Sequence, residues 1–223
     1  MAPIPDTQSS ASVAARWIKA NIVAAIVAAV ASLAVYGIRQ LTGAADAEAD
    51  LGARLVQYVA AIGFSGFSGA AMGVLTGAVL QRIIPALPAR AWVILHAAMG
   101  AVVALAAEVM TAFRSDAAAT DASTDDFPIA AWMLTGAVLG ASVGAIEALV
   151  LRRAASGSAA WIAWSTVGFA VAVALLAGGF RLWSPPEGGF AGELVNEIFD
   201  VVLGLIASVL LLPALRQLRP LAR

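Results

Sequence analysis

Six long apolar segments, separated by short polar stretches, dominate the sequence of this 223-residue chain. They are Ala20–Ile38, Leu55–Gln81, Ala91–Phe113, Ile129–Leu151, Trp161–Leu182 and Leu194–Leu215. A helix needs about 20 residues to cross the hydrocarbon core of a bilayer, and these segments have that length. The sequence therefore predicts an all-α membrane protein, a bundle of six transmembrane helices.

The composition agrees with this class and excludes several others. Hydrophobic residues make up 61% of the chain and charged residues 12%, whereas a soluble domain carries roughly 25% charged residues. A net charge of −1 leaves no basic surface for nucleic acid. With no cysteine and one histidine, the chain offers no disulfide and no zinc cluster, so we expect neither a metal nor a cofactor.

Basic residues lie mainly on one side of this arrangement. One side has Arg16, Lys19, Arg82, Arg90, Arg152, Arg153, Arg216, Arg219 and Arg223. The other side has Arg39, Arg54, Arg114 and Arg181. Because basic residues resist translocation, the first side is predicted to be cytoplasmic. Residues 1–19 and the tail at 218–223 would then both lie in the cytoplasm, flanking a transmembrane domain at 20–217.

The first apolar segment shares some features with a secretory signal. Arg16 and Lys19 precede it, and Ala45-Asp46-Ala47 follows as a small-x-small cleavage motif. Its apolar run is longer than the ~7–15 residues of a signal core, so we expect a retained anchor. The abundance of alanine and the short loops favour the bacterial inner membrane as its location.

All six tryptophans lie near predicted helix ends. They are Trp17, Trp92, Trp132, Trp161, Trp164 and Trp183. Aromatic rings with one wet edge prefer the headgroup level of a bilayer. We therefore expect these residues to be interfacial anchors.

Two segments carry small residues at every fourth position. The second segment has Ser65, Gly69, Gly73 and Gly77, and the fourth has Gly136, Gly140, Gly144 and Ala148. Small faces let helix backbones approach closely in lipid, so we predict that these faces pack against other helices. Residues 65–113 and 132–182 would form a weak internal helical-hairpin repeat. The alternative is a helix loosened at Gly63, Gly66 and Gly69 around a substrate.

Ionisable side chains inside the segments are candidate sites, since they are costly in lipid. They are His96, Glu108, Glu147 and Asp200. His96 and Glu147 lie at similar depth and are expected to be able to pair, while Glu108 and Asp200 are expected to point inward, with Arg54 and Gln57 as first partners for Glu108. Glu197 is set aside as too close to a helix end. These groups predict either interhelical hydrogen bonds or a proton or cation path.

One short motif points to an enzyme. The run Gly66-Phe67-Ser68-Gly69-Ala70-Ala71-Met72-Gly73 resembles the G-x-S-G-A-x-x-G motif of rhomboid intramembrane proteases, which also have a six-helix core. The resemblance implies that Ser68 is a nucleophile and His96 its base. The segments that hold the two residues are adjacent in this chain, whereas the family places another helix between them.

Three hypotheses follow from the sequence. The first is a non-enzymatic accessory or assembly subunit that packs through small helix faces, with the lipid bilayer, other membrane subunits or a second copy of itself as partners. The second is a small-solute or ion transporter or channel that uses His96, Glu108 and Asp200. The third is the rhomboid-like serine protease.

Overall fold

A computed structural model describes residues 10–43, 50–117, 128–182 and 189–221; side chains are not described at 107–117 and 180–182. Six of its helices are long and apolar enough to cross a membrane. The long helices are α1 Ser10–Thr42, α2 Leu51–Ile83, α3 Ala89–Ala117, α4 Ile129–Leu151, α5 Ser158–Leu182 and α6 Gly189–Leu210. A short helix and two short strands complete the fold: α7 Leu212–Gln217, β1 Ala155–Ser156 and β2 Arg219–Pro220.

Local sequence signals set several helix boundaries. Asp50 is the N-cap of α2, and its carboxylate accepts a hydrogen bond of 2.7 Å from the amide of Ala53. Pro128 is the N-cap of α4. Pro213, near the start of α7, fits the first turn of a helix but not a helix interior, so the last apolar segment is divided at Leu211.

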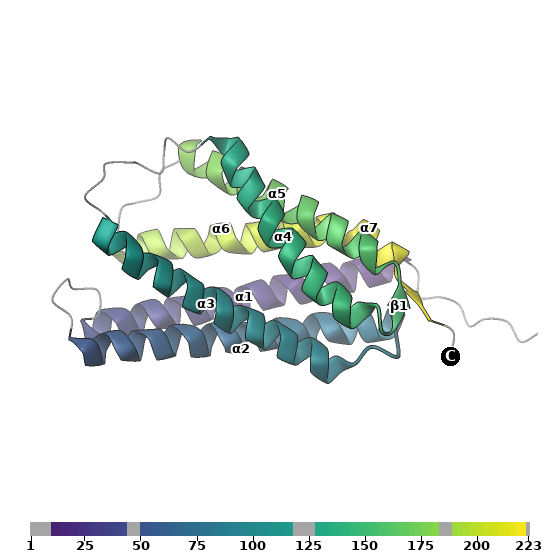
Figure 1. The fold of residues 1–223 in the computed structure, drawn as a ribbon, viewed down its shortest axis with the longest axis horizontal. Helices are drawn as coiled ribbons and strands as arrows, with labels where there is room; N and C mark the ends of the chain where they lie inside the picture. Colours follow the sequence, from purple (N-terminus) through teal and green to yellow (C-terminus); the bar gives the residue numbers. More distant parts are fainter. Residues whose placement is uncertain (1–9, 44–49, 118–127, 183–188, 222–223) are drawn as a thin grey trace, which may run out of the picture.

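The helices form a bundle with two different ends (Figure 1). The "base" is the end where α1 begins and where the α2–α3 turn, β1, β2 and α7 lie; the "open end" is the opposite one. Helix α2 packs along α3, α4 along α5, and α1 and α6 contact each other and these hairpins. Helices α3 and α4, by contrast, make few contacts with each other and diverge toward the open end.

A two-residue ladder closes the base. Strand β1 pairs with β2 in antiparallel register, with Ala155 opposite Pro220 and Ser156 opposite Arg219. Gly157 follows with φ +89°, and the carbonyl of Gln217 lies where a Cβ would be, so only glycine fits at this position. The ladder was not predicted from the sequence.

The best-packed core lies at the base. It consists of Trp17, Ala20, Val79, Leu80, Ile84, Leu87, Trp92, Leu151, Ala154, Ala155, Trp161, Ala214, Leu215 and Leu218. The expectation that Trp17, Trp92 and Trp161 are anchors with one wet edge is wrong, because these rings are only 2%, 0% and 1% exposed. Their indole N–H groups are bonded inside the protein, which lets the rings be buried whole.

The small faces lie at close helix contacts, as predicted. A Cβ on Gly73 would lie 2.8 Å from Val93 Cα of α3, and a Cβ on Gly144 would lie 3.1 Å from Ile162 Cα of α5. Larger side chains at these glycines would force the backbones apart. Helix α2 is unbroken from Leu51 to Ile83, so the alternative of a loosened second segment is not observed.

Candidate functional site

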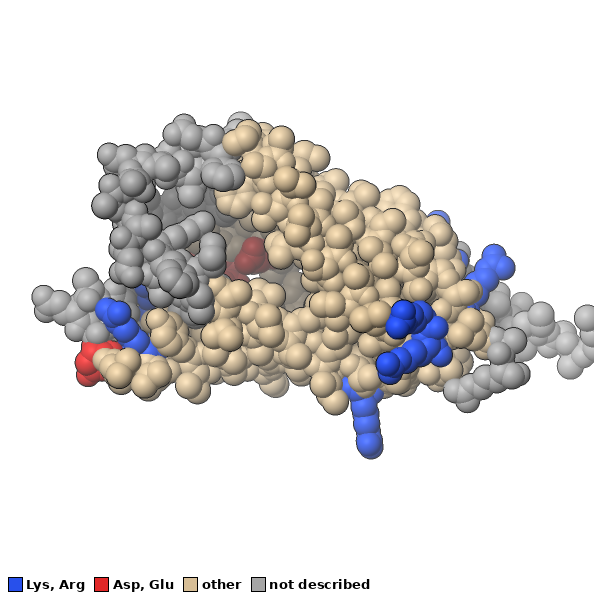
Figure 2. All heavy atoms as spheres, in the orientation of Figure 1, with Lys and Arg blue, Asp and Glu red and all other residues tan. Residues whose placement is uncertain are grey.

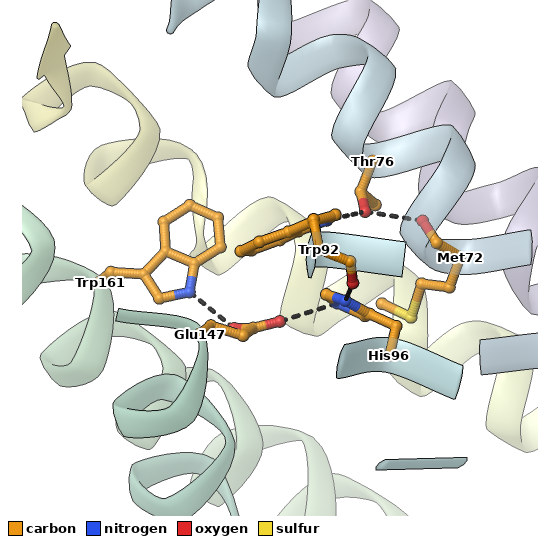
Figure 3. Close-up of polar contacts among 6 residues, drawn as sticks. All are labelled: Met72, Thr76, Trp92, His96, Glu147 and Trp161. Atoms are coloured by element: carbon orange, nitrogen blue, oxygen red, sulfur yellow. Dashed lines mark hydrogen bonds and ion pairs between the residues drawn. The ribbon is translucent and has the colours of Figure 1, made fainter. Parts of the chain in front are cut away.

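A chain of polar contacts crosses four helices near the base (Figure 3). It begins on α2 with Thr76, whose side chain is buried and donates a 2.6 Å hydrogen bond to the carbonyl oxygen of Met72. The same hydroxyl oxygen accepts a 3.0 Å hydrogen bond from the indole of Trp92 on α3. This pair ties α2 to α3 where a bare hydroxyl and a bare indole N–H would each be costly in an apolar interior.

His96 lies one turn beyond Trp92 on α3 and is 4% exposed. Its Nδ1 lies 2.9 Å from the carbonyl oxygen of Trp92. A carbonyl can only accept, so Nδ1 carries a hydrogen and the other ring nitrogen is left to face outward from α3. That nitrogen, Nε2, lies 3.0 Å from Oε1 of Glu147 on α4.

Glu147 uses both of its carboxyl oxygens. Oε1 faces His96, and Oε2 accepts a 2.7 Å hydrogen bond from the indole of Trp161 on α5. The expected pairing of His96 with Glu147 is therefore confirmed. We call Thr76, Trp92, His96, Glu147 and Trp161 the polar joint, since together they connect α2, α3, α4 and α5.

The position of the hydrogen between His96 and Glu147 explains how the polar joint can be buried. Because Nδ1 of His96 is already a donor, the contact between Nε2 and Glu147 needs one further hydrogen, on either the ring or the carboxyl group. The pair is then an imidazolium with a carboxylate or a neutral imidazole with a carboxylic acid. Either arrangement has no net charge, which avoids leaving an uncompensated ion in the interior.

Trp17 extends the contact network to the remaining two long helices. Its ring meets that of Trp161 edge-on, with centroids 5.7 Å apart, and Trp161 meets Trp92 in the same way at 6.3 Å. The indole of Trp17 donates a 3.1 Å hydrogen bond to the carbonyl oxygen of Ser208 on α6. The base is thus held by aromatic packing and hydrogen bonds that involve all six long helices.

Ser165 is a buried polar group without a partner. Its hydroxyl is the one buried side-chain polar atom in the described residues that makes no hydrogen bond. The Ser165 side chain packs against Gly144, and a Cβ added to Gly144 would lie 2.8 Å from the Cβ of Ser165. Ser165 and His96 lie in equivalent positions opposite the small faces. The carbonyl oxygen of His96 crowds Gly69 of α2, and the carbonyl oxygen of Ser165 crowds Gly140 of α4.

The other predicted intramembrane acids are not part of the polar joint. Asp200 is exposed, and the expectation that it points into the bundle stays a prediction. Glu197, set aside in the sequence, is instead the buried acid of α6, at 8% exposure, and is hydrogen-bonded to Ser32 of α1. The side chain of Glu108 lies outside the described residues.

Some members of the polar joint were missed from the sequence. Thr76 was not singled out, and Trp161 was expected to be an anchor. One signal was available: Thr76 and Glu147 each lie three residues after the third small residue of their stripes, Gly73 and Gly144. The two residues therefore occupy matching positions, and each accepts an indole hydrogen bond from the following helix.

The side chains implied by the resemblance to rhomboid proteases have other partners. The hydroxyl of Ser68 donates a 3.0 Å hydrogen bond to the carbonyl oxygen of Ser65, one turn earlier on α2. Both ring nitrogens of His96 are occupied by Trp92 and Glu147. The structure therefore does not place the serine and the histidine as a bonded pair.

The observations define a helical bundle with six helices apolar enough to cross a membrane. Within the described residues, no group of three or more His, Cys, Asp or Glu side chains is placed to hold a metal ion. Comparison of the chain with protein-family models, curated proteins and solved structures gives no match.

Proposed function

We propose that this chain is a multi-pass integral membrane protein whose base faces the cytoplasm. Apolar side chains are exposed along all six long helices, as expected of helices that face acyl chains. The base carries eight described basic residues and the open end four, Arg39, Arg54, Arg114 and Arg181, an asymmetry that favours this orientation. The bacterial inner membrane is the location that fits the alanine-rich helices and short loops.

Two-sided labelling tests this orientation. Single cysteines at Ser123 and Ser156, in a chain with no native cysteine, should react with a membrane-impermeant maleimide from opposite sides of the membrane. Ser156 should react only after the cytoplasmic side is exposed. Labelling of both from one side would contradict the proposed topology.

We further propose that the protein is a non-enzymatic accessory or assembly subunit. The observation that carries this proposal is that the hydrogen-bonding atoms of His96 and Glu147 in the polar joint all have partners within the protein. Both nitrogens of His96 and both oxygens of Glu147 have protein partners, so the ring has no free nitrogen and the carboxyl group is held between two helices. The ionisable side chains of His96 and Glu147 thus act as connections between helices.

The helix contacts also support an internal repeat of two hairpins, α2–α3 and α4–α5. In each hairpin, a glycine of the first helix crowds a backbone Cα of the second, and a polar side chain three residues further on accepts an indole hydrogen bond. We propose that the second copy replaced the threonine acceptor with Glu147 and that the first copy acquired His96. Those two differences join the copies to each other.

The state of the protein in its own membrane tests the assembly proposal. Extraction in a mild detergent, followed by native mass spectrometry, should show a fixed stoichiometric complex with another membrane subunit or with itself. Cross-linking in intact membranes should give the same species before extraction. A monomer under both conditions, together with a measurable solute flux in liposomes, would contradict an accessory role.

The exposure of Asp200 favours a second candidate function, transport. Asp200 lies near the middle of α6 (Gly189–Leu210) yet is exposed, and Figure 2 shows acidic side chains in a hollow away from the ends of the bundle. A carboxylate at that depth costs several kcal/mol against acyl chains unless water or a partner reaches it. Water that reaches this depth would make Asp200 part of a cation or proton path.

Flux measurements separate the two candidates. Proteoliposomes containing a pH-sensitive dye should show no protein-dependent proton flux if the protein is an accessory subunit. If it is a transporter, wild type should carry a flux that Asp200→Asn abolishes. Glu193→Gln, about two turns nearer the start of α6, is the matched control and should keep that flux.

A further inference from the structure

The basic residues that the structure describes at the base are all exposed. They are Arg16, Lys19, Arg82, Arg90, Arg152, Arg153, Arg216 and Arg219. In the described parts of the chain, none of them pairs with a carboxylate, and the nearest acid in sequence, Glu147, is occupied by His96 and Trp161. Figure 2 shows these blue side chains gathered at the end where α7 and β1 lie.

The short β-ladder concentrates part of this charge. It pairs Ser156 with Arg219, 63 residues further along the chain, and the amide of Leu221 donates a 3.0 Å hydrogen bond to the carbonyl oxygen of Ala154. Arg152 and Arg153 immediately precede Ala154. The ladder therefore places Arg219 opposite Ser156, three residues beyond Arg153 along β1, on the same edge of the base. We call these three exposed arginines the arginine cluster (Arg152, Arg153 and Arg219).

The cluster stands on a rigid support. Ala154, Ala155 and Leu218, which lie between or beside the arginines in sequence, are 2–4% exposed and belong to the base core. Like charges held together repel each other, so the arrangement is stabilised only where anions come close. The arginine side chain offers a planar fork of N–H donors that matches a phosphate group.

The position of the cations indicates which anion is near. They lie at the ends of five of the apolar helices, within a turn or two of residues that face acyl chains, and not on a separate soluble domain. This is the level of lipid headgroups in a bilayer, and basic residues there are attracted to anionic lipids. A phosphate on a lipid would reach the cluster with its acyl chains alongside the helices.

We propose that the base binds anionic phospholipid headgroups, with the arginine cluster as the principal phosphate site. The inference rests on the proposed membrane insertion and goes beyond it, because insertion alone requires no particular lipid. Headgroup binding would stabilise the base and retain specific lipids with the purified protein.

Nanodiscs of defined composition test this inference. Wild-type protein should unfold about 2–4 °C higher in phosphatidylcholine nanodiscs containing phosphatidylglycerol than in phosphatidylcholine alone. It should also retain phosphatidylglycerol in native mass spectrometry. The triple variant Arg152→Gln/Arg153→Gln/Arg219→Gln should lose most of both effects while unfolding at the wild-type temperature in phosphatidylcholine.

Controls identify the ligand and its place. Arg39→Gln, which removes an exposed cation at the open end, should leave the response intact. Inorganic phosphate at matched ionic strength should not reproduce it, and if it does, a free phosphate site replaces the lipid site. Retention of an acidic protein in place of lipid would also overturn the proposal.

The outcomes distinguish the lipid site from the membrane insertion on which it rests. Protein that does not enter nanodiscs would overturn membrane insertion and the lipid site with it. Protein that enters both kinds of nanodisc and unfolds at the same temperature in each would overturn only the lipid site. An equal loss of response in the triple variant and in Arg39→Gln would show that the charge effect is general.

Discussion

The base and the open end of the bundle are built from similar helices but packed differently. From the base to the middle of the bundle, a Cβ on Gly69, Gly73 or Gly140 would collide with a neighbouring helix, and within the α4–α5 hairpin this crowding continues to Gly136. Gly37, Gly63 and Gly178, nearer the open end, have nothing within 4 Å of that position. The polar joint lies on the base side of this division, while Glu197 of α6 is buried closer to the open end. Small residues bring helices together only where a matching face opposes them, and that contact provides the closed setting in which polar groups can be bonded to each other.

The largest expected effect comes from breaking the polar joint on one side. Glu147→Leu leaves Nε2 of His96 and the indole of Trp161 without their acceptor, and should lower the free energy of unfolding by about 3–5 kcal/mol. Thermal unfolding in detergent measures it. The double variant His96→Leu/Glu147→Leu should recover much of the loss, because an apolar pair replaces a polar one. A double variant as unstable as the single one would contradict this account.

Alanine at two glycines of the same helix should have opposite effects. Gly73→Ala places a methyl group 2.8 Å from Val93 Cα and should cost about 1–3 kcal/mol. Gly63→Ala meets no neighbour and should stabilise by up to about 1 kcal/mol, since alanine favours the helix. Chemical denaturation of both variants under one condition checks the comparison. Equal effects would mean that the two halves of α2 are packed equally tightly against their neighbours.

The two matching tryptophans sharpen the comparison within the base. Phenylalanine keeps the packing of the ring but removes the indole donor. Trp161→Phe should cost about 2 kcal/mol, because it removes a hydrogen bond to a carboxyl group, and Trp92→Phe about 1 kcal/mol, because its acceptor is a hydroxyl. Unfolding in detergent should rank the variants in this order. The reverse order would argue against a charge-bearing Glu147.

The smallest effect is expected at Asp200. Because this side chain is exposed, Asp200→Asn should change the free energy of unfolding by less than about 0.5 kcal/mol. Glu197→Gln, at a buried and hydrogen-bonded acid of the same helix, is the comparison and should cost more. A large loss at Asp200 would show that the open end is as tightly packed as the base.

Periodicity and charge predicted much of the fold. Apolar length located six helices, four-residue spacing located the close contacts at Gly73 and Gly140, and equal depth predicted the pairing of His96 with Glu147. These are local properties or properties of one helix. Helix α1 begins at Ser10, ten residues before the predicted span, because Arg16 and Lys19 interrupt an apolar run without disfavouring a helix.

What the sequence could not predict depends on neighbours. Asn196, Asp200, Gly204 and Ser208 share one face of α6, yet that face is buried only at Ser208, where Trp17 packs against it. The register of a helix says which residues lie together but not how far a partner helix follows them. The two-residue ladder likewise joins segments 63 residues apart with no pattern of its own.

In the membrane orientation that we propose, the shared proton of His96 and Glu147 has a consequence for the response of the protein to membrane voltage. Moving one elementary charge through a potential of about 100 mV changes the energy by about 2.3 kcal/mol. The pair is neutral whichever residue holds the proton, so a displacement of the two together performs almost no electrical work. An energised bilayer would leave this connection between the hairpins undisturbed, while the unpaired arginines of the base would feel the field at its edge.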